Sequence, residues 1–472
     1  MFDKVSYKSR EISKVWWITG TVTVILVICC SLRHELFQST AWDLGIFDQA
    51  VYLISQGKTP ISTFLDFHIL GDHAAFIFYP LALLYKIYPT VYWLFLVQAL
   101  ALALGAIPLW YLATDAGVKD KQATAIAIAY LCYPLVFNIN LFDFHPDVIA
   151  PVALLTAVLT ARRKNLTGFC LSIILILSCK AVLSLTVAAL GLWLLLWEKR
   201  RLYGLIALIS GIAWFFIATK AIIPYFGTDA SSIERHISRF GYLGKSIPEV
   251  LTNLFLKPGL VLGKIFSADN IGYLSLLLIP VIWGLSFTGL TPMIGAIPTL
   301  GLNLLADYPM QKDLIHQYSL PILPFLFLTV IQTLSLGKGW LKNNRMIICW
   351  SLIIFLILAK YGYFWSIYAD TLDTWQATRQ AVSQVNTEDG VLTAAEISPH
   401  LSHRPLIKLV SSISQPQELE KFEYILVNIR YPGWSTNRES TINLVNQLKA
   451  SNTFLLKYQK DDVYLFELDN NF

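Results

Sequence analysis

The sequence predicts a polytopic bundle of membrane-spanning helices followed by a small soluble α/β domain. The 472 residues are 55% hydrophobic and 14% charged, whereas soluble globular proteins carry about 25% charged residues. The apolar residues gather into blocks of about 20 residues, the length of a helix that crosses the hydrocarbon layer. Because backbone groups in lipid must pair within their own segment, we expect these blocks to be helices.

The apolar blocks predict about eleven membrane spans. They cover residues 15–32, 89–113, 121–138, 148–161, 165–179, 181–197, 202–224, 271–288, 290–304, 316–336 and 346–364. The shorter block 74–88 contains Pro80 and Lys86, which suits an interfacial or re-entrant piece better than a span. We therefore expect a transmembrane domain over 1–365, with a long first loop at 33–88 and a second long loop at 225–270.

Basic residues predict the orientation of the chain. Lysine and arginine gather in alternate joints, at Lys119 and Lys121, at 162–164, at 199–201 and at 338–345. Cytoplasmic joints carry this excess, so we expect a cytoplasmic N-terminus. The loops 33–88 and 225–270 and the domain 366–472 would then lie outside. Counting 74–88 as a span would scatter the basic joints over both sides.

The last hundred residues read as an α/β domain. Period-two apolar runs predict strands at Val391–Ala395, Leu406–Val410, Tyr424–Asn428, Thr453–Lys457 and Val463–Glu467, and helical patterns cover Thr374–Val385 and Thr441–Ala450. No glycine-rich phosphate loop precedes either helix. The net charge of +5 is small and gives no reason to expect a nucleic-acid partner.

The first outer loop holds the densest group of ionisable residues. It contains Asp43 and Asp48, then Asp66, His68, Asp72 and His73. Asp and His are ligands of divalent metals, and either Asp43 or Asp48 could act as a general base. On one helix the first two would lie about 140° apart, so a turn at Gly45 would be needed to bring them together. The alternative is an ordinary solvated loop with helix caps.

Other polar groups fall in joints on the same predicted outer face. Asp143 and His145 lie between two spans, where the neighbouring Asp147 could cap the helix that follows. Further candidates for binding an anionic substrate are Lys180, Arg235, Arg239, Lys312, His316 and Tyr318. Lys180 could instead snorkel to the interface. Ionisable residues at membrane depth are candidates for function.

Several motifs resemble an uncharacterised bacterial membrane-protein family, the one numbered 2079 among the domains of unknown function. They are Trp42-Asp43-x-Gly45-x-x-Asp48-Gln49, Gly71-x-His73, Pro80-x-x-x-x-Tyr85, Gln98-Ala99-Leu100, Gly105-Ala106-Ile107-Pro108-Leu109, Phe142-Asp143-Phe144-His145-Pro146, His316-x-Tyr318 and Ser398-Pro399-His400-Leu401 with Arg404. The resemblance covers nearly the whole chain. It departs at one place, because Ala181 and Val182 stand where the pattern implies an acidic pair after Lys180.

That family is similar in layout to the GT-C glycosyltransferases, which have many spans and an acidic first outer loop. The resemblance implies sugar transfer from a polyprenyl-phosphate donor at the outer face of a bacterial cytoplasmic membrane. It implies Asp43, then Asp48, as base, and a divalent metal, Mg²⁺ or Mn²⁺, on Asp43, Asp48, His68, His73, Asp143 and His145. The acceptor stays undefined. A transporter or flippase and a non-catalytic envelope scaffold are the alternatives; the former usually places charges near mid-span.

Overall fold

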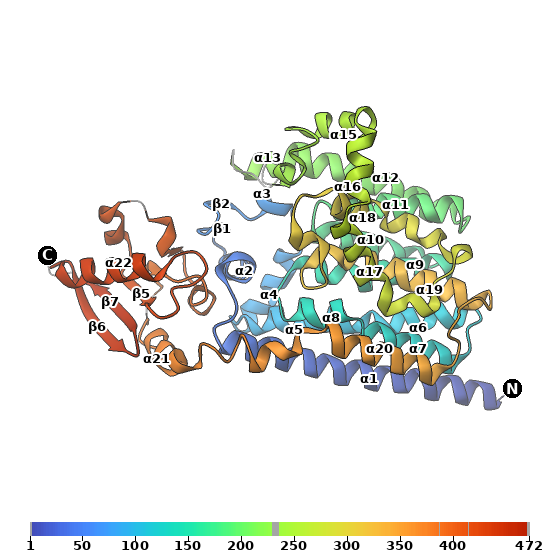
Figure 1. Cartoon of the computed structure of the whole chain (residues 1–472), viewed down its shortest axis with the longest axis horizontal. Coiled ribbons are helices and arrows are strands. Elements are labelled where there is room, and N and C mark those ends of the chain that lie inside the picture. Colours follow the sequence, from blue (N-terminus) through green and yellow to red (C-terminus); the bar gives the residue numbers. More distant parts are fainter. Residues whose placement is uncertain (1, 229–235, 387, 414, 470–472) are drawn as a thin grey trace. The chain divides into compact units, whose positions relative to one another are not determined.

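The computed structural model describes residues 2–228, 236–386, 388–413 and 415–469 (Figure 1). The chain divides into two compact units. The membrane unit comprises Met1–Val27, Leu70–Ile77 and Leu96–Lys360, and the C-terminal unit comprises Ile28–Ile69, Phe78–Phe95 and Tyr361–Phe472. Most of the first loop therefore folds together with the C-terminal residues, an association that the sequence did not indicate.

Within the described residues, six helical segments have the length and composition of membrane spans. The first three are Arg10–Glu35 in α1 (Phe2–Glu35), Tyr92–Asp115 in α5 (Tyr92–Leu104) and α6 (Ala106–Asp115), and Asp120–Asn140 in α7 (Asp120–Leu131) and α8 (Pro134–Asn140). The fourth is Arg201–Phe226, in α12 (Arg201–Ile217) and α13 (Ile223–Phe226). The last two are Pro309–Ser335, which ends in α19 (Leu323–Ser335), and Asn344–Trp365, which begins with α20 (Asn344–Leu358). A seventh is the pair Pro258–Ile265 (α16) and Ala268–Gly284 (α17 and η5), bent by 49°.

Four of the eleven expected spans are shorter helices. The blocks 148–161, 165–179, 181–197 and 290–304 correspond to α9 (Ala150–Arg162), α10 (Leu166–Cys179), α11 (Leu183–Leu196) and α18 (Ile297–Leu305) with the turn before it. The sequence count therefore corresponds to seven helices of full length and four shorter ones. The doubtful block 74–88 contains only the ten-residue helix α4 (Phe78–Ile87), which is too short to cross the hydrocarbon layer.

Burial separates central from peripheral helices in the membrane unit. The segments 92–115, 120–140 and 309–335 are 72%, 83% and 83% buried, whereas 10–35, 201–226 and 344–365 are only 28%, 22% and 22% buried. The peripheral helices expose large apolar side chains such as Trp17, Ile209 and Ile357. Exposed apolar faces of this extent are unfavourable in water, which agrees with a surface that meets lipid.

Glycines allow α11 and α12 to pack closely. A Cβ at Gly191 would lie 2.3 Å from the backbone nitrogen of Leu208, and one at Gly211 would lie 2.6 Å from that of Ala188. Small residues permit such backbone approach between helices in lipid, where packing rather than hydrophobic burial favours association. Alanine at either position would force the two helices apart.

The C-terminal unit contains a three-layer α/β fold, with a five-stranded sheet in the order β4-β3-β5-β7-β6. The strands are β3 (Val391–Thr393), β4 (Ile407–Leu409), β5 (Tyr424–Asn428), β6 (Phe454–Lys460) and β7 (Val463–Leu468). β3 is parallel to β4 and β5, and β7 is antiparallel to β5 and β6. All five expected strands are thus confirmed.

Two helices cover opposite faces of this sheet (Figure 1). Ala377 and Ala381 of α21 (Leu372–Val382) pack on the face that contains Leu426, and Val445 and Leu448 of α22 (Arg438–Ala450) pack on the other face. Successive residues of a strand point to opposite faces, so β5 alternates between the two cores. Both helices were expected from the sequence.

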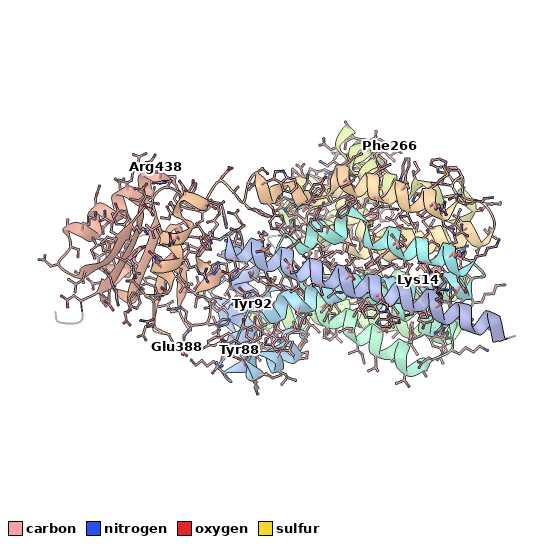
Figure 2. All side chains as sticks on the ribbon, turned by 90° about the horizontal axis from the view of Figure 1, so that it is seen from below. Lys14, Tyr88, Tyr92, Phe266, Glu388 and Arg438 are labelled. Atoms are coloured by element: carbon pink, nitrogen blue, oxygen red, sulfur yellow. The ribbon has the colours of Figure 1, made fainter. Side chains whose placement is uncertain are left out.

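The remaining described elements connect these parts. In the first loop they are the π-helical turn η1 (Ala41–Gly45), α2 (Ile46–Ser55), the short pair β1 (Ile61–Ser62) and β2 (Phe67–His68), and α3 (Leu70–His73). The loop 225–270 contributes α15 (Ile247–Leu256) and α16. Phe266, at the end of α16, is 71% exposed (Figure 2).

Candidate functional site

Asp48, in the first turn of α2, is the centre of a buried network in the C-terminal unit. Its side chain is 1% exposed and accepts hydrogen bonds from Tyr85 Oη at 2.5 Å and from the hydroxyl of Ser402. His403 Nε2 lies 3.1 Å from Asp48 Oδ2, and Tyr52 stacks on the His403 ring. Burial disfavours the charged imidazole, but the Asp48 carboxylate outweighs it and raises the pKa of His403.

Neighbouring contacts extend this network through the unit. Gln49 Nε2 donates to the carbonyl of Arg404 at 3.1 Å. Tyr52 Oη donates to Glu388, a surface residue (Figure 2), at 3.0 Å, and the ring of His34 stacks on that of His400 at 3.9 Å. Helix α2 is thereby bound to the segment 400–404. Asp48 already has three partners, so its geometry favours holding structure over accepting a substrate proton.

Asp43 lies in a strained turn just before α2. Its φ of 79° and ψ of −85° are rare for a residue other than glycine. The turn is held by the Ala41 amide, which donates to the Ala395 carbonyl at 2.8 Å, and by the Thr40 hydroxyl, which donates to the Trp42 carbonyl at 2.8 Å. Ala41 is fully buried, whereas Asp43 is half-buried. Strain of this kind persists where surrounding contacts impose it, and it concentrates at functional sites.

The expected turn at Gly45 is wrong in position. Gly45 has helical angles, φ −60° and ψ −42°, and the chain reverses at Trp42 and Asp43 instead. A Cβ at Gly45 would lie 3.2 Å from the ring of Phe64, so a larger residue would require that ring to shift by a few tenths of an ångström. Sequence reasoning assigned the turn to glycine, the residue that adopts positive φ most readily.

His68 and Asp66 lie further along the first loop. His68 is in β2, and partial burial lowers its pKa. Asp66 forms an ion pair with Lys408 of β4 at 2.8 Å. The loop is thus fixed against the C-terminal sheet by an exposed ion pair, which by itself contributes little stability.

A second polar group lies in the membrane unit, around a buried ion pair. Lys180 Nζ lies 3.2 Å from Asp147 Oδ2, and the two side chains are 9% and 6% exposed. Asp147 makes no helix cap, so the capping interpretation is wrong. Asp72 and Tyr318 lie within electrostatic reach of Lys180. Lys180 is too deeply buried to be a snorkelling side chain.

His73 approaches the same region through its backbone. Its carbonyl accepts a hydrogen bond from the Ala181 amide at 2.9 Å, and its ring lies 5.6 Å from that of His236. The His73 Nε2 atom is 3.2 Å from Asp72 Oδ2. Gly71 fits here only as glycine, since a Cβ would lie 2.5 Å from the Gly227 nitrogen.

Aromatic contacts join two other expected site segments in the membrane unit. The ring of Phe142 stacks on His145 at 5.4 Å and meets the edge of His316 at 4.4 Å. Asp143 has a φ of 130°, and both Asp143 and His145 are buried. His316 Nδ1 lies 2.6 Å from Asp313 Oδ2, an acidic partner that the sequence did not single out.

Arg239 and Tyr318 form a third pair in this region. The Arg239 guanidinium donates to Tyr318 Oη and to Gln311 Oε1, each at 3.2 Å. It also lies over the ring of Tyr308 at 4.3 Å. In the described part of the chain these partners are neutral groups. Lys312 is half-buried at the end of η8 (Pro309–Lys312), and Arg235 lies outside the described residues.

The structure thus distributes the expected site residues between the two units. Asp43, Asp48 and His68 belong to the C-terminal unit. The membrane unit holds His73, Asp143, His145, Lys180, Arg239, Lys312, His316 and Tyr318. The convergence of all the acidic and histidine residues on one site stays a prediction.

The expected metal ligands are divided between the two units. No three side chains of His, Cys, Asp or Glu in that part of the chain are placed to share an ion. Asp48 has both oxygens occupied by other partners. A divalent ion therefore stays a prediction from the resemblance.

Sequence reasoning missed Ser402 and His403, which complete the Asp48 network. Their signal was present in the sequence, because Ser402-His403-Arg404 follows the Ser398-Pro399-His400-Leu401 motif. It was missed because contacts across more than three hundred residues leave no local periodicity. The pairing of Asp147 with Lys180, 33 positions apart, was missed as well.

Fold and polar groups together define a polytopic membrane protein with an α/β domain at its C-terminal end. The chain belongs to the DUF2079 family of predicted membrane proteins, whose model matches residues 33–465. No curated protein matches the sequence.

Solved structures show the same fold. Two are ArnT from Cupriavidus metallidurans, one bound to undecaprenyl phosphate and one in the apo state. The lipid-bound structure is 12% identical to this chain with a TM-score of 0.54, and the match covers 96% of this chain and 98% of ArnT. The apo structure is 12% identical with a TM-score of 0.52, and the match covers 95% of this chain and 98% of ArnT. The expected GT-C-like architecture is thereby confirmed.

Proposed function

We propose that this protein transfers a sugar from a polyprenyl-phosphate donor to an acceptor hydroxyl at the outer face of the bacterial cytoplasmic membrane. The observation that carries the proposal is the strained, half-buried turn of Asp43 in the first loop. Similarity to ArnT over nearly the whole chain supports it, since that protein was crystallised with a polyprenyl phosphate. Fold alone does not assign an activity.

The proposed transfer reaction requires few side chains to take part. The Asp43 carboxylate would accept the proton of the acceptor hydroxyl while the acceptor oxygen attacks the anomeric carbon. The bond from that carbon to the phosphate oxygen breaks, and its electron pair leaves with the lipid phosphate. Such a reaction depends on positioning and on stabilising charge at the phosphate. Half-burial suits Asp43 to this role, because the carboxylate is held but still reachable.

The membrane unit offers cations for the lipid phosphate. Arg239 has only neutral partners among the described residues, and its guanidinium can bind two phosphate oxygens at once. Lys180 is already paired with Asp147, which makes it the weaker candidate. Asp48 holds α2 in place and acts as a positioning residue for the Asp43 turn.

The test compares Asp43→Asn with Asp66→Asn, a carboxylate of the same loop that is exposed and paired with Lys408. In cells that lack the gene, we expect Asp43→Asn to leave envelope glycans as in the deletion, while Asp66→Asn restores them. With purified protein and radiolabelled polyprenyl-phosphate hexoses or pentoses, Asp43→Asn should lower transfer by about 10²–10⁴-fold. Absence of transfer by wild type, with unchanged glycans on deletion, would rule out the proposal.

A further inference from the structure

The C-terminal unit contains a cavity of about 310 Å³ at one edge of its sheet. It lies where the parallel strands β3 and β5 end, between the turn at Glu396 and the segment 430–434. In α/β sheets, ligands bind beyond the carboxyl ends of the parallel strands. The position of this cavity is therefore that of a ligand site, and no residue in it takes part in the proposed transfer chemistry.

The Glu396 side chain lines this cavity, and only one of its two carboxyl oxygens has a hydrogen-bond partner among the described residues. Glu396 Oε1 accepts from the Trp434 amide at 3.1 Å, whereas Oε2 is shielded from solvent and has no hydrogen-bond partner among the described residues. A buried acceptor without a partner costs about 1–3 kcal/mol. Burial also raises the pKa of Glu396. A ligand hydroxyl would satisfy Oε2.

Gly433 allows the chain to close over this carboxyl group. Its φ is 88°, and a Cβ would lie 2.3 Å from Glu396 Oε2. The backbone angle favours glycine there, and a Cβ would have to displace the Glu396 carboxyl group. The close approach of Gly433 to Glu396 is therefore a structural feature of the cavity wall.

The rest of the wall combines aromatic rings with neutral polar groups. Trp434 is 57% exposed, and Trp375 and Tyr431 are half-buried. Asn428 and Thr378 also line the cavity and are held by hydrogen bonds to Thr374. The rings of such a wall can cover the C–H face of a sugar while its hydroxyls bond to polar groups at the rim, the mixture that specific small-molecule sites show.

The charges around the cavity disfavour an ionic ligand. The Arg430 guanidinium also lines it but is already held by Asp373 at 2.6 Å and Asp462 at 2.8 Å. A cationic ligand would meet Arg430, and an anionic one would meet Glu396 and these two aspartates. A neutral, hydroxyl-rich molecule would be repelled by neither set of charges.

We propose that this cavity binds a neutral sugar unit, and that the unit belongs to the acceptor of the transfer. The second part rests on the proposed function. It is supported by the bond from the Ala41 amide to the Ala395 carbonyl, because Ala395 adjoins Glu396 while Ala41 anchors the Asp43 turn. The turn that holds the proposed base and the wall of the cavity therefore share one segment of the chain.

The binding test uses the full-length protein in nanodiscs with methyl glycosides of mannose, galactose, arabinose and N-acetylglucosamine as probes. Tryptophan fluorescence and saturation-transfer NMR would be recorded up to tens of millimolar sugar. We expect at least one glycoside to bind with a Kd of about 1 mM. Glu396→Gln and Trp434→Ala should each weaken it about tenfold or more, and Gly433→Ala should abolish it.

Matched controls are Glu420→Gln and Trp340→Ala, exposed residues outside the cavity, which should bind as wild type. Binding that survives all three cavity variants, binding of tetramethylammonium in place of every sugar, or no sugar binding at all would each overturn the proposal. Sugar binding without any transfer would reject the proposed function and the acceptor assignment but keep the site. Transfer whose acceptor KM is unchanged in Glu396→Gln would reject the site but keep the function.

Discussion

The two units hold their carboxylates in different ways. In the membrane unit, Asp147 is buried against a full positive charge on Lys180. In the C-terminal unit, Asp48 is buried against two hydroxyls and an imidazole, while Asp43, five residues earlier, stays half-buried in a strained turn. The difference separates the two buried carboxylates from Asp43, which we propose as the reacting group. Density of charge along the sequence does not make that distinction.

The largest effect is expected from breaking the buried ion pair in the membrane unit. Lys180→Met leaves Asp147 buried without its cation, which costs about 3–5 kcal/mol. The double variant Lys180→Met with Asp147→Leu should recover most of that loss, because it removes both charges. Thermal unfolding in detergent measures both. Equal instability of the single and double variants would show that the pair does not act as a unit.

A smaller loss is expected for Asp48→Asn in the C-terminal unit. The amide keeps the shape but leaves one of three donors without an acceptor, at a cost of about 1–3 kcal/mol. The variant should unfold at a lower temperature and lose part of its transfer activity through misplacement of α2. Ser402→Ala is the matched control, since it removes a single hydroxyl and should cost less. A variant as stable as wild type would contradict the anchoring role.

The pH dependence of the C-terminal unit should be smaller still and has a defined sign. Because the pKa of His403 is raised in the folded state, its stabilising contribution is complete below the ordinary value of about 6.5. It is lost as pH rises through the raised pKa. Wild type should therefore lose more thermal stability than His403→Gln between pH 6 and about 8. Parallel pH profiles for the two proteins would refute the pairing with Asp48.

The fold was largely predictable because its signals are local. Apolar block length located the spans, and period-two runs located every strand of the C-terminal sheet, with β5 matching Tyr424–Asn428 to the residue. Four of the eleven expected spans are shorter helices in the structure. The break between two of them was predicted correctly, since the backbone becomes extended at Lys180, with φ −164° and ψ 139°.

The site was less predictable because its contacts are long-range. The residues themselves were found, since Asp43, Asp48 and Lys180 stand out by type. Their partners were not, because His403 lies 355 positions from Asp48 along the chain. The glycine argument failed at Gly45 since tertiary contacts, such as that from Ala41 to Ala395, impose the positive φ on Asp43 instead.

The most direct test of the account is transfer by purified protein, measured for Asp43→Asn and Asp48→Asn beside their thermal stability. The account predicts that Asp43→Asn keeps wild-type stability and loses about 10²–10⁴-fold in kcat. It predicts that Asp48→Asn loses stability and retains more of the rate. The reverse pattern, with Asp43→Asn active and Asp48→Asn stable but inactive, would contradict the assignment of Asp43 as base and Asp48 as anchor.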